Sequence, residues 1–420
     1  MKTYLCIDLK TFYASVECAE RNLDPFKTNL AVCDLSRGKG AICLAISPKL
    51  KAMGIKNRCR AFEIPKDVEF IAAKPRMALY IKYSSDIYGI YLRYISKDDI
   101  YVYSIDEAFL DVTSYLKLYK MSAEMLAKKI MSDIFNELHI TATCGIGTNL
   151  YLAKIALDIT AKHINTNIAY LNEELYQKSL WHHTPLTDFW RIGKGIEKRL
   201  HNLGIYDMEG ITKANPTDLK KAFGVDYEIL LDHAYGIEPT TISDIKKYSS
   251  RGRSLSQGQI LFEDYSFKDA RIVVKEMVDV LSLELVDKEL VTNSVSLMIR
   301  YSKDTIKSTG ASKTIPERTN VYSVLAKHIL DIYDKTTHQY QLIRGISISF
   351  NNVLDRSFEE YDLFSDEEKL KEERKLEETI NNLKKKFGKN SVLRGMSYEE
   401  KATARKRNLL IGGHNSGEEE

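Results

Sequence analysis

Short apolar runs alternate with helical patterns over the first 165 residues. Apolar runs bounded by turn signals predict strands at residues 4–8, 100–104, 108–112 and 141–145, and a further strand pair at 30–34 and 41–45. Apolar residues at helical spacing predict helices over 12–20, 74–92, 122–138 and 149–160. This alternation indicates a mixed α/β sheet layer.

The middle of the chain has a different pattern. Between residues 175 and 235, short helical segments are joined by glycines, as in the run from Ile192 through Gly193 and Gly195 to Ile196. Residues 237–250 show no apolar periodicity and contain Pro239, so we expect a tether there.

Residues 254–352 predict a small domain of their own. Strands are expected near 257–262, 295–301, 305–313 and 342–350, with helices over 267–285 and 321–333. Their order is β-α-β-β-α-β, which is typical of a split βαβ domain. Beyond Glu359 the chain is rich in charge, with one helical pattern that ends at Gly388 and a terminus, 417–420, that we expect to be disordered.

Composition narrows the class of protein. A chain of 420 residues is too long for one ordinary core, so several domains are expected. The formal charge of +3 permits a nucleic-acid partner without requiring one. The six cysteines form no C-x-x-C pair, which predicts buried, reduced thiols in a cytoplasmic protein without zinc. A secretory leader and a long apolar stretch are both lacking, so we expect neither secretion nor membrane insertion.

Three carboxylates carry the candidate chemistry. Asp8 closes the first predicted strand, and Asp106 and Glu107 fall in the turn between two others. Adjacent acids between apolar strands are costly to bury unless something neutralises them, and hard divalent cations prefer oxygen ligands. Two such ions about 3.5–4 Å apart can activate a hydroxyl and stabilise a leaving pyrophosphate. The structural alternative is a surface hairpin with solvated acids.

Three motifs place these carboxylates in a known context. Residues 8–17, 103–111 and 145–158 read DLKTFYASVE, YSIDEAFLD and GIGTNLYLAKIALD. Together they resemble the Y-family translesion DNA polymerases, of the UmuC/DinB-like kind and in particular the Gram-positive UmuC-like branch. The resemblance covers essentially the whole chain.

The resemblance implies an α/β (α+β) multidomain fold with the right-hand arrangement of polymerases. It assigns residues 1–28 and 66–165 to the palm, 29–65 to small fingers, and 166–236 to a thumb with a helix-hairpin-helix. A tether at 237–253 leads to a split-βαβ little finger at 254–353, followed by a clamp-binding peptide and charged tail at 354–420.

The resemblance also implies a two-metal site. Asp8 and Asp106 would bridge two Mg²⁺ ions, Glu107 would be the ligand nearer the primer 3′-hydroxyl, and the carbonyl of Leu9 would complete the shell.

Around this site the resemblance implies contacts to the nucleotide. Tyr13 corresponds to the steric gate that excludes a ribose 2′-OH, and N–H groups around Phe12 would meet the triphosphate at a helix start. Lys154 and Lys51 would contact the triphosphate, although many members carry arginine where this chain has Lys51. Further phosphate candidates are Arg37 and Arg58.

Contacts to nucleic acid are expected in the last two-thirds of the chain. Gly193 and Gly195 would let backbone N–H groups hold a duplex phosphate. Cations near the little finger would follow the phosphates, namely Arg251, Arg253, Arg300, Lys303, Lys307 and Lys313, part of them on one solvent face. Leu363 and Phe364 resemble the anchors of a clamp-binding peptide, with Glu360 where glutamine is usual.

The implied function is template-directed, low-fidelity insertion of dNTPs opposite damaged DNA, as in the SOS response. Expected partners are primer–template DNA, dNTPs, a sliding clamp, a UmuD-like accessory protein and RecA. One alternative is a palm-type nucleotide cyclase, which would leave the helix-hairpin-helix and the basic domain without a purpose. The other is a catalytically inactive DNA-binding scaffold, against which the presence of all three carboxylates and Tyr13 argues.

Overall fold

The computed structural model describes residues 2–38, 40–249, 253–303, 305–360 and 366–417. The chain divides into two compact units. Unit 1 contains Met1–Tyr248 with Asn415–Glu419, and unit 2 contains Ser249–His414 with Glu420. Within the described ranges, no helix is both long enough and apolar enough to cross a membrane.

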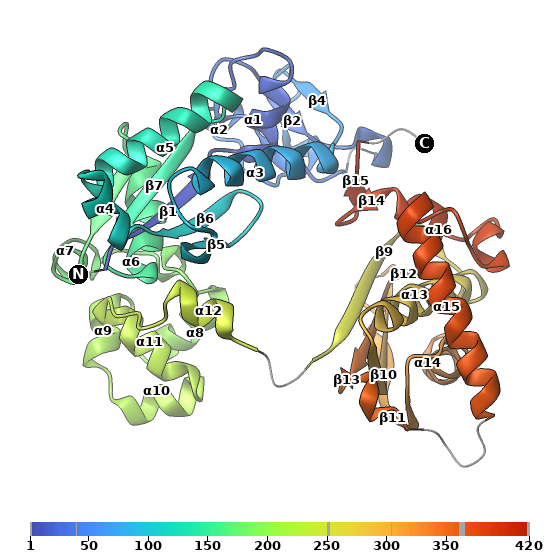
Figure 1. Ribbon diagram of the computed structural model, residues 1–420. Helices are drawn as coiled ribbons and strands as arrows, with labels where there is room; N and C mark the ends of the chain where they lie inside the picture. Colours follow the sequence, from blue (N-terminus) through green and yellow to red (C-terminus); the bar gives the residue numbers. More distant parts are fainter. Residues whose placement is uncertain (1, 39, 250–252, 304, 361–365, 418–420) are drawn as a thin grey trace. The chain divides into compact units, whose positions relative to one another are not determined.

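A five-stranded sheet forms the centre of unit 1. Its order is β5-β6-β1-β7-β8, with β1 Tyr4–Leu9, β5 Ile100–Val102, β6 Glu107–Asp111, β7 Ala142–Gly147 and β8 Ile168–Leu171. Strand β1 runs antiparallel to both β6 and β7. Helices α3 (Met77–Leu92) and α5 (Ala123–Leu138) lie on one face, and α6 (Leu150–Ile155) lies on the other (Figure 1). Because both faces are covered, β7 is buried throughout and β1 is buried except at the partly exposed Asp8.

A three-stranded sheet forms a second cluster in unit 1. Its order is β3-β2-β4, with β2 Leu30–Val32, β3 Ala45–Ile46 and β4 Ile71–Ala73. The partner of β2 was expected at 41–45, but Ile42 instead forms a bridge to Arg60, and β3 begins only at residue 45. Helix α2 (Pro48–Ala52) follows, capped by the Ser47 hydroxyl. All six cysteines of the chain are buried with free thiols.

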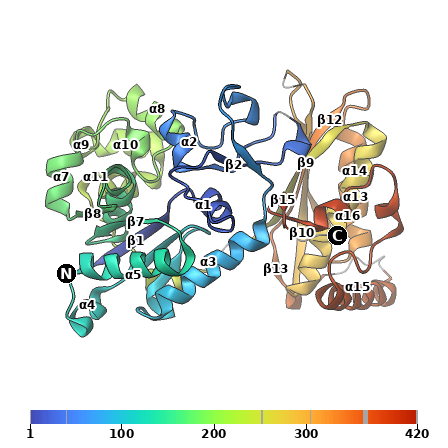
Figure 2. The same cartoon turned by 90° about the horizontal axis from the view of Figure 1, so that it is seen from above.

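Helix α1 (Phe12–Ala19) follows β1 and lies beside α3 (Figure 2). The remaining helices of unit 1 are α4 Thr113–Tyr119, α7 Glu173–Leu180, α8 Lys194–Asn202, α9 Met208–Lys213, α10 Pro216–Phe223, α11 Asp226–Tyr235 and α12 Ile242–Lys247. Helix α12 falls where the tether was expected. It begins with a capping box between Thr241 and Asp244, and Ile242 is buried in the same cluster as Tyr4 and Phe109. One buried apolar residue leaves no periodic pattern, so the sequence did not reveal this helix.

Unit 2 has the β-α-β-β-α-β order that the sequence predicts. Its elements are β9 Leu255–Tyr265, α13 Phe267–Asp287, β10 Leu290–Tyr301, β11 Thr309–Thr319, α14 Tyr322–Thr336 and β12 Ile343–Asn351. The strands are ordered β11-β10-β12-β9, with antiparallel neighbours. Helices α13 and α14 cover one face of the sheet and enclose its apolar core (Figure 1).

The charged segment after this sheet also folds. Its elements, with the short strand before them, are β13 Leu354–Asp355, α15 Glu367–Phe387, α16 Ala404–Asn408, β14 Leu410–Ile411 and β15 His414–Asn415. Helix α15 lies on α13, where Asn381 Nδ2 donates to the Leu283 carbonyl at 2.9 Å. The buried carboxylate of Glu276 accepts from the backbone N–H groups of Thr403 and Ala404, at 2.8 and 3.1 Å. The tail up to Ala404 therefore packs on the helical face of unit 2, whereas Asn415–Glu419 belong to unit 1.

Candidate active site

Strand pairing brings the three acidic residues together. Asp8 and Glu107 are register partners across β1 and β6. The backbone N–H of Leu9 donates to the Asp106 carbonyl at 2.9 Å, and the Asp106 carboxylate accepts from Ser104 Oγ at 2.6 Å. The strand end and the tight turn, which are nearly a hundred residues apart in the sequence, therefore meet at one place on the sheet.

Two glycines position the next group. A Cβ atom on Gly145 would lie 2.0 Å from the Ala153 carbonyl oxygen, and one on Gly147 would lie 2.2 Å from the Ala153 nitrogen. Only glycine allows this close approach of α6 to β7. The contact places Lys154, the next residue of α6, against Glu107, with Nζ 2.6 Å from Oε2.

Two lysines and a fourth carboxylate complete the cluster. Lys154 Nζ also lies 3.0 Å from Asp158 Oδ2. Lys162 Nζ lies 2.8 Å from Asp158 Oδ1 and 3.3 Å from Asp8 Oδ2. Asp158 is thus shared by two ammonium groups, each of which also contacts one of the predicted metal ligands.

Lys162 was not among the site residues predicted from the sequence, and Asp158 had no predicted role. Residues Ala156–Thr160 continue α6 as a turn of π-helix, which adds one residue to the turn and changes the direction of the side chains that follow. The four-residue spacing of Lys154, Asp158 and Lys162 was the available signal, because it places alternating charges on one helical face.

The predicted nucleotide contacts lie around the same cluster. Tyr13 interacts electrostatically with Asp106 and with Arg58. Lys51, from α2, interacts electrostatically with Asp8, and so does Lys10. The ring of Phe12 is buried in the core, so the backbone of this residue is the part available to a ligand. Arg37 instead pairs with its neighbour Asp34, Nε to Oδ2 at 3.4 Å.

The carboxylates of the cluster are paired with lysines, and their donor type suits a hard cation. Burial, reinforced by the negative charges of Asp106 and Glu107, raises the pKa of Asp8 to about 6, although Lys162 acts in the opposite direction. In the part of the chain that the structure describes, no three His, Cys, Asp or Glu side chains converge as they would around a metal ion. Lysines neutralise the acids instead. The donor set, three carboxylates, consists of the hard oxygen ligands that Mg²⁺ prefers.

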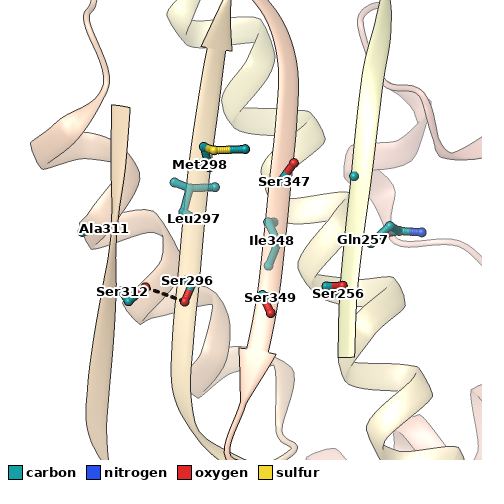
Figure 3. Close-up of a pocket in the computed structure, with 11 residues that line it drawn as sticks. Ser256, Gln257, Ser296, Leu297, Met298, Ala311, Ser312, Ser347, Ile348 and Ser349 are labelled. Atoms are coloured by element: carbon teal, nitrogen blue, oxygen red, sulfur yellow. Dashed lines mark hydrogen bonds between the residues drawn. The ribbon is translucent and has the colours of Figure 1, made fainter. Parts of the chain in front are cut away.

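The face of the unit 2 sheet that α13 and α14 leave uncovered is lined by hydroxyl groups. A groove of about 360 Å³ runs across all four strands, and its lining includes Ser256, Ser296, Ser312, Ser347 and Ser349 (Figure 3). Ser296 and Ser312 share a hydrogen bond of 2.8 Å between β10 and β11. Such a surface can donate hydrogen bonds to phosphate oxygens without any charge of its own.

The predicted cations of unit 2 divide between the two faces of its sheet. Arg300 follows Ser296 and Met298 along β10 and lies over Gly345. It is therefore on the uncovered face that the five serines line, called the serine face below. Lys313 lies on the helical face, with Nζ 3.5 Å from Asp331 Oδ2 of α14, so it does not belong to the part of the set that shares a solvent face with Arg300. The reason is the two-residue period of a strand, which puts Lys313 on the same side as the buried Ile315.

Of the remaining predicted DNA and clamp contacts, Gly193, Gly195 and Arg253 lie in the described part of the chain. Gly193 is the N-cap of α8, and no described atom would lie within 4 Å of a Cβ placed on it or on Gly195. These exposed glycines therefore leave the turn open to an approaching backbone. Arg253 accepts at its carbonyl from the Val353 N–H at 3.1 Å, beside the sheet. Arg251, Leu363 and Phe364 lie outside the described residues.

Comparison with known proteins identifies the family and relatives of this chain. Residues 7–158 match the impB/mucB/samB family, and residues 253–363 match the C-terminal domain of that family. UvrX of Bacillus subtilis (strain 168), whose name describes a UV-damage repair protein, is 33% identical over 99% of this chain and 98% of its own. DNA polymerase IV 2 of the same organism is 29% identical over 98% of each chain. DNA polymerase IV of Lactococcus lactis subsp. lactis (strain IL1403) is 30% identical over 82% of this chain and 92% of its own.

Solved structures share the fold. The Y-family DNA polymerase chimera Dbh-Dpo4(243-245)-Dbh superposes with a TM-score of 0.65 at 20% identity, covering 84% of this chain and 99% of its own. A Dbh ternary complex superposes with a TM-score of 0.52 at 20% identity, covering 83% of this chain and 99% of its own. The predicted multidomain α/β fold is confirmed. Since the family match, the full-length relatives and the fold agree, the chain belongs to the UmuC/DinB-like Y-family DNA polymerases.

Proposed function

We propose that this chain is a template-directed, low-fidelity DNA polymerase that inserts dNTPs opposite damaged bases. The observation that carries the proposal is the pairing of Asp8 with Glu107 beside Asp106, faced by Lys154 and Lys162. In the reaction, the primer 3′-oxygen attacks the α-phosphorus and loses its proton. The bond from that phosphorus to the bridging oxygen breaks, and pyrophosphate leaves with the bonding electrons.

Y-family polymerases are nucleotidyltransferases that typically use divalent metal ions. We assign two Mg²⁺ ions to the carboxylates of Asp8, Asp106 and Glu107 and to the carbonyl of Leu9. When bound, such ions supply Lewis-acid stabilisation of the attacking and leaving oxygens.

The lysines of the cluster are proposed to bind the triphosphate. Lys154, Lys162 and Lys51 each interact with a carboxylate in the described structure. A triphosphate would offer them charge-assisted hydrogen bonds of the same kind. Main-chain N–H groups at the start of α1, around Phe12, would add neutral donors.

Tyr13 is proposed as the steric gate. It stands on the first turn of α1, directly after the strand that carries Asp8, and interacts with Asp106. A ring in this place would occupy the space that a ribose 2′-hydroxyl needs, so dNTPs would be accepted over rNTPs.

We propose the same assignment of residues to the palm, fingers, thumb and little finger that the resemblance implies. Residues 1–28 and 66–165 would be the palm, 29–65 the fingers, 166–236 the thumb and 254–353 the little finger. Phosphates of primer and template would meet the open turn at Gly193 and Gly195, and in unit 2 the serine face with Arg300, Arg253 and Arg251.

The test is primer extension with dNTPs and Mg²⁺ on templates with and without an abasic site. We expect the wild type to extend past the lesion, and Asp106→Ala and Glu107→Ala to lose roughly three orders of magnitude in rate while still binding DNA. Error counts on undamaged template should be far above those of a replicative enzyme. DNA binding without extension by the wild type would support the inactive scaffold, and a cyclic product made from an NTP without DNA would support the cyclase.

The partners beyond DNA and dNTPs are also proposals. Residues 361–364 would dock on a sliding clamp through Leu363 and Phe364. A clamp added to the extension reaction should lengthen the products of the wild type but not those of a Leu363→Ala/Phe364→Ala variant. Adding a UmuD-like protein and RecA filaments to the same assay tests whether bypass depends on them.

A further inference from the structure

The ring of Tyr13 rests on a second tyrosine. Tyr80, from the first turn of α3, stacks on it with 4.6 Å between ring centroids and 20° between ring planes. Tyr80 is fully buried, whereas Tyr13 is only half-buried. The stack therefore fixes one face of the Tyr13 ring, and its other surroundings include Asp106 and Arg58.

Tyr80 is in turn held at its hydroxyl. Its oxygen donates to Glu17 Oε1 at 2.7 Å. Glu17 stands four residues after Tyr13 on α1, so both side chains project from the same face of that helix. The tyrosine pair and the carboxylate therefore form a bridge between α1 and α3, which lie side by side (Figure 2).

Glu17 is a fully buried carboxylate with its charge balanced. Arg76 donates to it twice, from Nε at 3.0 Å and from Nη2 at 2.8 Å, and Arg21 donates from the next turn of α1. Burial opposes ionisation of Glu17, but the bonds from Arg76, Tyr80 and Arg21 hold its pKa below the usual value. Such a charged, fully bonded group is costly to displace.

Arg76 is itself packed within unit 1. The Ala78 N–H at the start of α3 donates to the Ser416 carbonyl at 2.9 Å. A Cβ atom on Gly417 would lie 2.8 Å from Arg76 Cβ. Arg76, which holds Glu17, is thus itself packed against the segment 416–417, and the contacts continue from that segment to the Tyr13 ring.

We infer that Tyr80, with Glu17 and Arg76 behind it, positions the Tyr13 ring and so determines how strongly the enzyme discriminates dNTPs from rNTPs. The inference rests on the proposed role of Tyr13 as the steric gate. A Tyr13 ring that could rotate away would admit a ribose 2′-hydroxyl. A ring stacked on a fixed partner cannot rotate away, so it would exclude that hydroxyl. Tyr80, Glu17 and Arg76 are positioning residues, since they act through Tyr13.

The test is single-nucleotide insertion, comparing kcat/KM for a dNTP with kcat/KM for the matching rNTP. Tyr80→Leu removes the stack but keeps an apolar side chain in the core. We expect it to lower the dNTP/rNTP ratio by roughly ten-fold or more, since small misplacements of a positioning group have effects of this size. Tyr80→Phe keeps the ring and loses only the bond to Glu17, and should lower the ratio by roughly five-fold, the equivalent of one ordinary hydrogen bond.

The matched control is Tyr83→Phe. Tyr83 also projects from α3 and donates to a carboxylate of α1, Glu20 Oε1, at 2.7 Å. Loss of this hydroxyl breaks a second, exposed link between the same two helices without touching Tyr13, so the ratio should stay unchanged. A merely structural role of Tyr80 would lower activity toward both nucleotides equally.

Two outcomes separate the inference from the function on which it rests. If Tyr13→Ala abolishes discrimination while Tyr80→Phe and Tyr80→Leu, both folded by thermal melting, leave the ratio at the wild-type value, the positioning role is wrong and the gate stands. If Tyr13→Ala leaves the ratio unchanged, the gate itself is wrong.

Discussion

At Gly145 and Gly147, β7 carries no side chain on the face that α6 covers. The backbone atoms of Ala153 that an added Cβ would meet cannot move without displacing the whole helix. We therefore expect Gly147→Ala to lower the free energy of unfolding by about 3 kcal/mol or more, as in severe overpacking. Chemical denaturation measures this.

Gly89 supplies the control for this prediction. It lies within α3, and no described atom would lie within 4 Å of its Cβ. Gly89→Ala should be neutral or should stabilise the protein by up to about 1 kcal/mol, because alanine favours a helix interior. Equal stabilities of Gly147→Ala and the wild type would mean that α6 does not pack on β7 as described.

Asp158 is a second residue on which the site depends. It neutralises both Lys154 and Lys162, so Asp158→Asn should leave these lysines misplaced. We expect kcat/KM for dNTPs to fall by roughly ten-fold or more, the usual size of effects at supporting residues. Glu124→Gln, which breaks the exposed Lys128–Glu124 pair of α5 at the same helical spacing, should leave kcat/KM unchanged. Wild-type activity of Asp158→Asn would rule out the supporting role.

Residues at strand ends could be predicted from the sequence, and residues after an irregular turn could not. Asp8, Asp106 and Glu107 stand where apolar runs break at acids, and the resemblance of the three motifs singles them out as candidates. Their meeting needs only the regular pairing of β1 with β6. Lys162 depends on the π-helix at Ala156–Thr160. One additional residue in a turn leaves the apolar pattern nearly unchanged, so a regular helix was expected over 149–160.

At the scale of elements, α15 is joined to α14 through a buried acid. Glu377 is 1% exposed, and its Oε1 accepts from the Tyr322 N–H and from Arg394 Nη2, each at 3.3 Å. Burial, followed by the negative charge of Glu373, raises the pKa of Glu377 to about 8, although Arg394 acts against this. The carboxyl is therefore protonated in the folded protein over a range where it would be ionised in the unfolded chain.

This pKa gives a pH dependence of stability with a definite sign. Between the ordinary value of 4.5 and about 8, the folded state holds a proton that the unfolded state has lost, so stability decreases as pH rises through this window. The Tm of unit 2 should fall over that range in the wild type, and Glu377→Gln should remove this part of the fall. The exposed neighbour Glu378, changed to Gln, should retain the wild-type slope. A Glu377→Gln slope equal to that of the wild type would contradict the assignment.

At the scale of the whole molecule, the chain has separate cores in its two units. Apolar residues of β9–β12, α13 and α14 form the core of unit 2, while unit 1 has clusters of its own. We expect two unfolding transitions in calorimetry, because cooperative units with separate cores unfold independently. Leu325→Ala, in the core of unit 2, should shift only one of them. A single transition that moves as a whole would mean that the units unfold together.

The sequence predicts the order of elements better than their limits. The order of elements in unit 2 could be predicted because each strand and helix has a clear apolar period of its own. The limit of unit 1 lies at Tyr248, beyond α12, rather than at the start of the expected tether, since a six-residue helix with a single buried residue has no period to detect. Which face a cation occupies depends on register, and so the sequence left open that Lys313 lies on the helical face.

The pairing of lysines with acids has a consequence for how the site would meet its substrates. The named groups, Asp8, Asp106, Glu107 and Asp158 with Lys10, Lys51, Lys154 and Lys162, carry equal numbers of opposite charges. A triphosphate with two divalent ions is also close to neutral as a set. Either component alone would leave an excess of one sign in a partly buried site. The nucleotide and the metal ions should therefore bind together, as a set with little net charge. Each should then raise the apparent affinity of the site for the other.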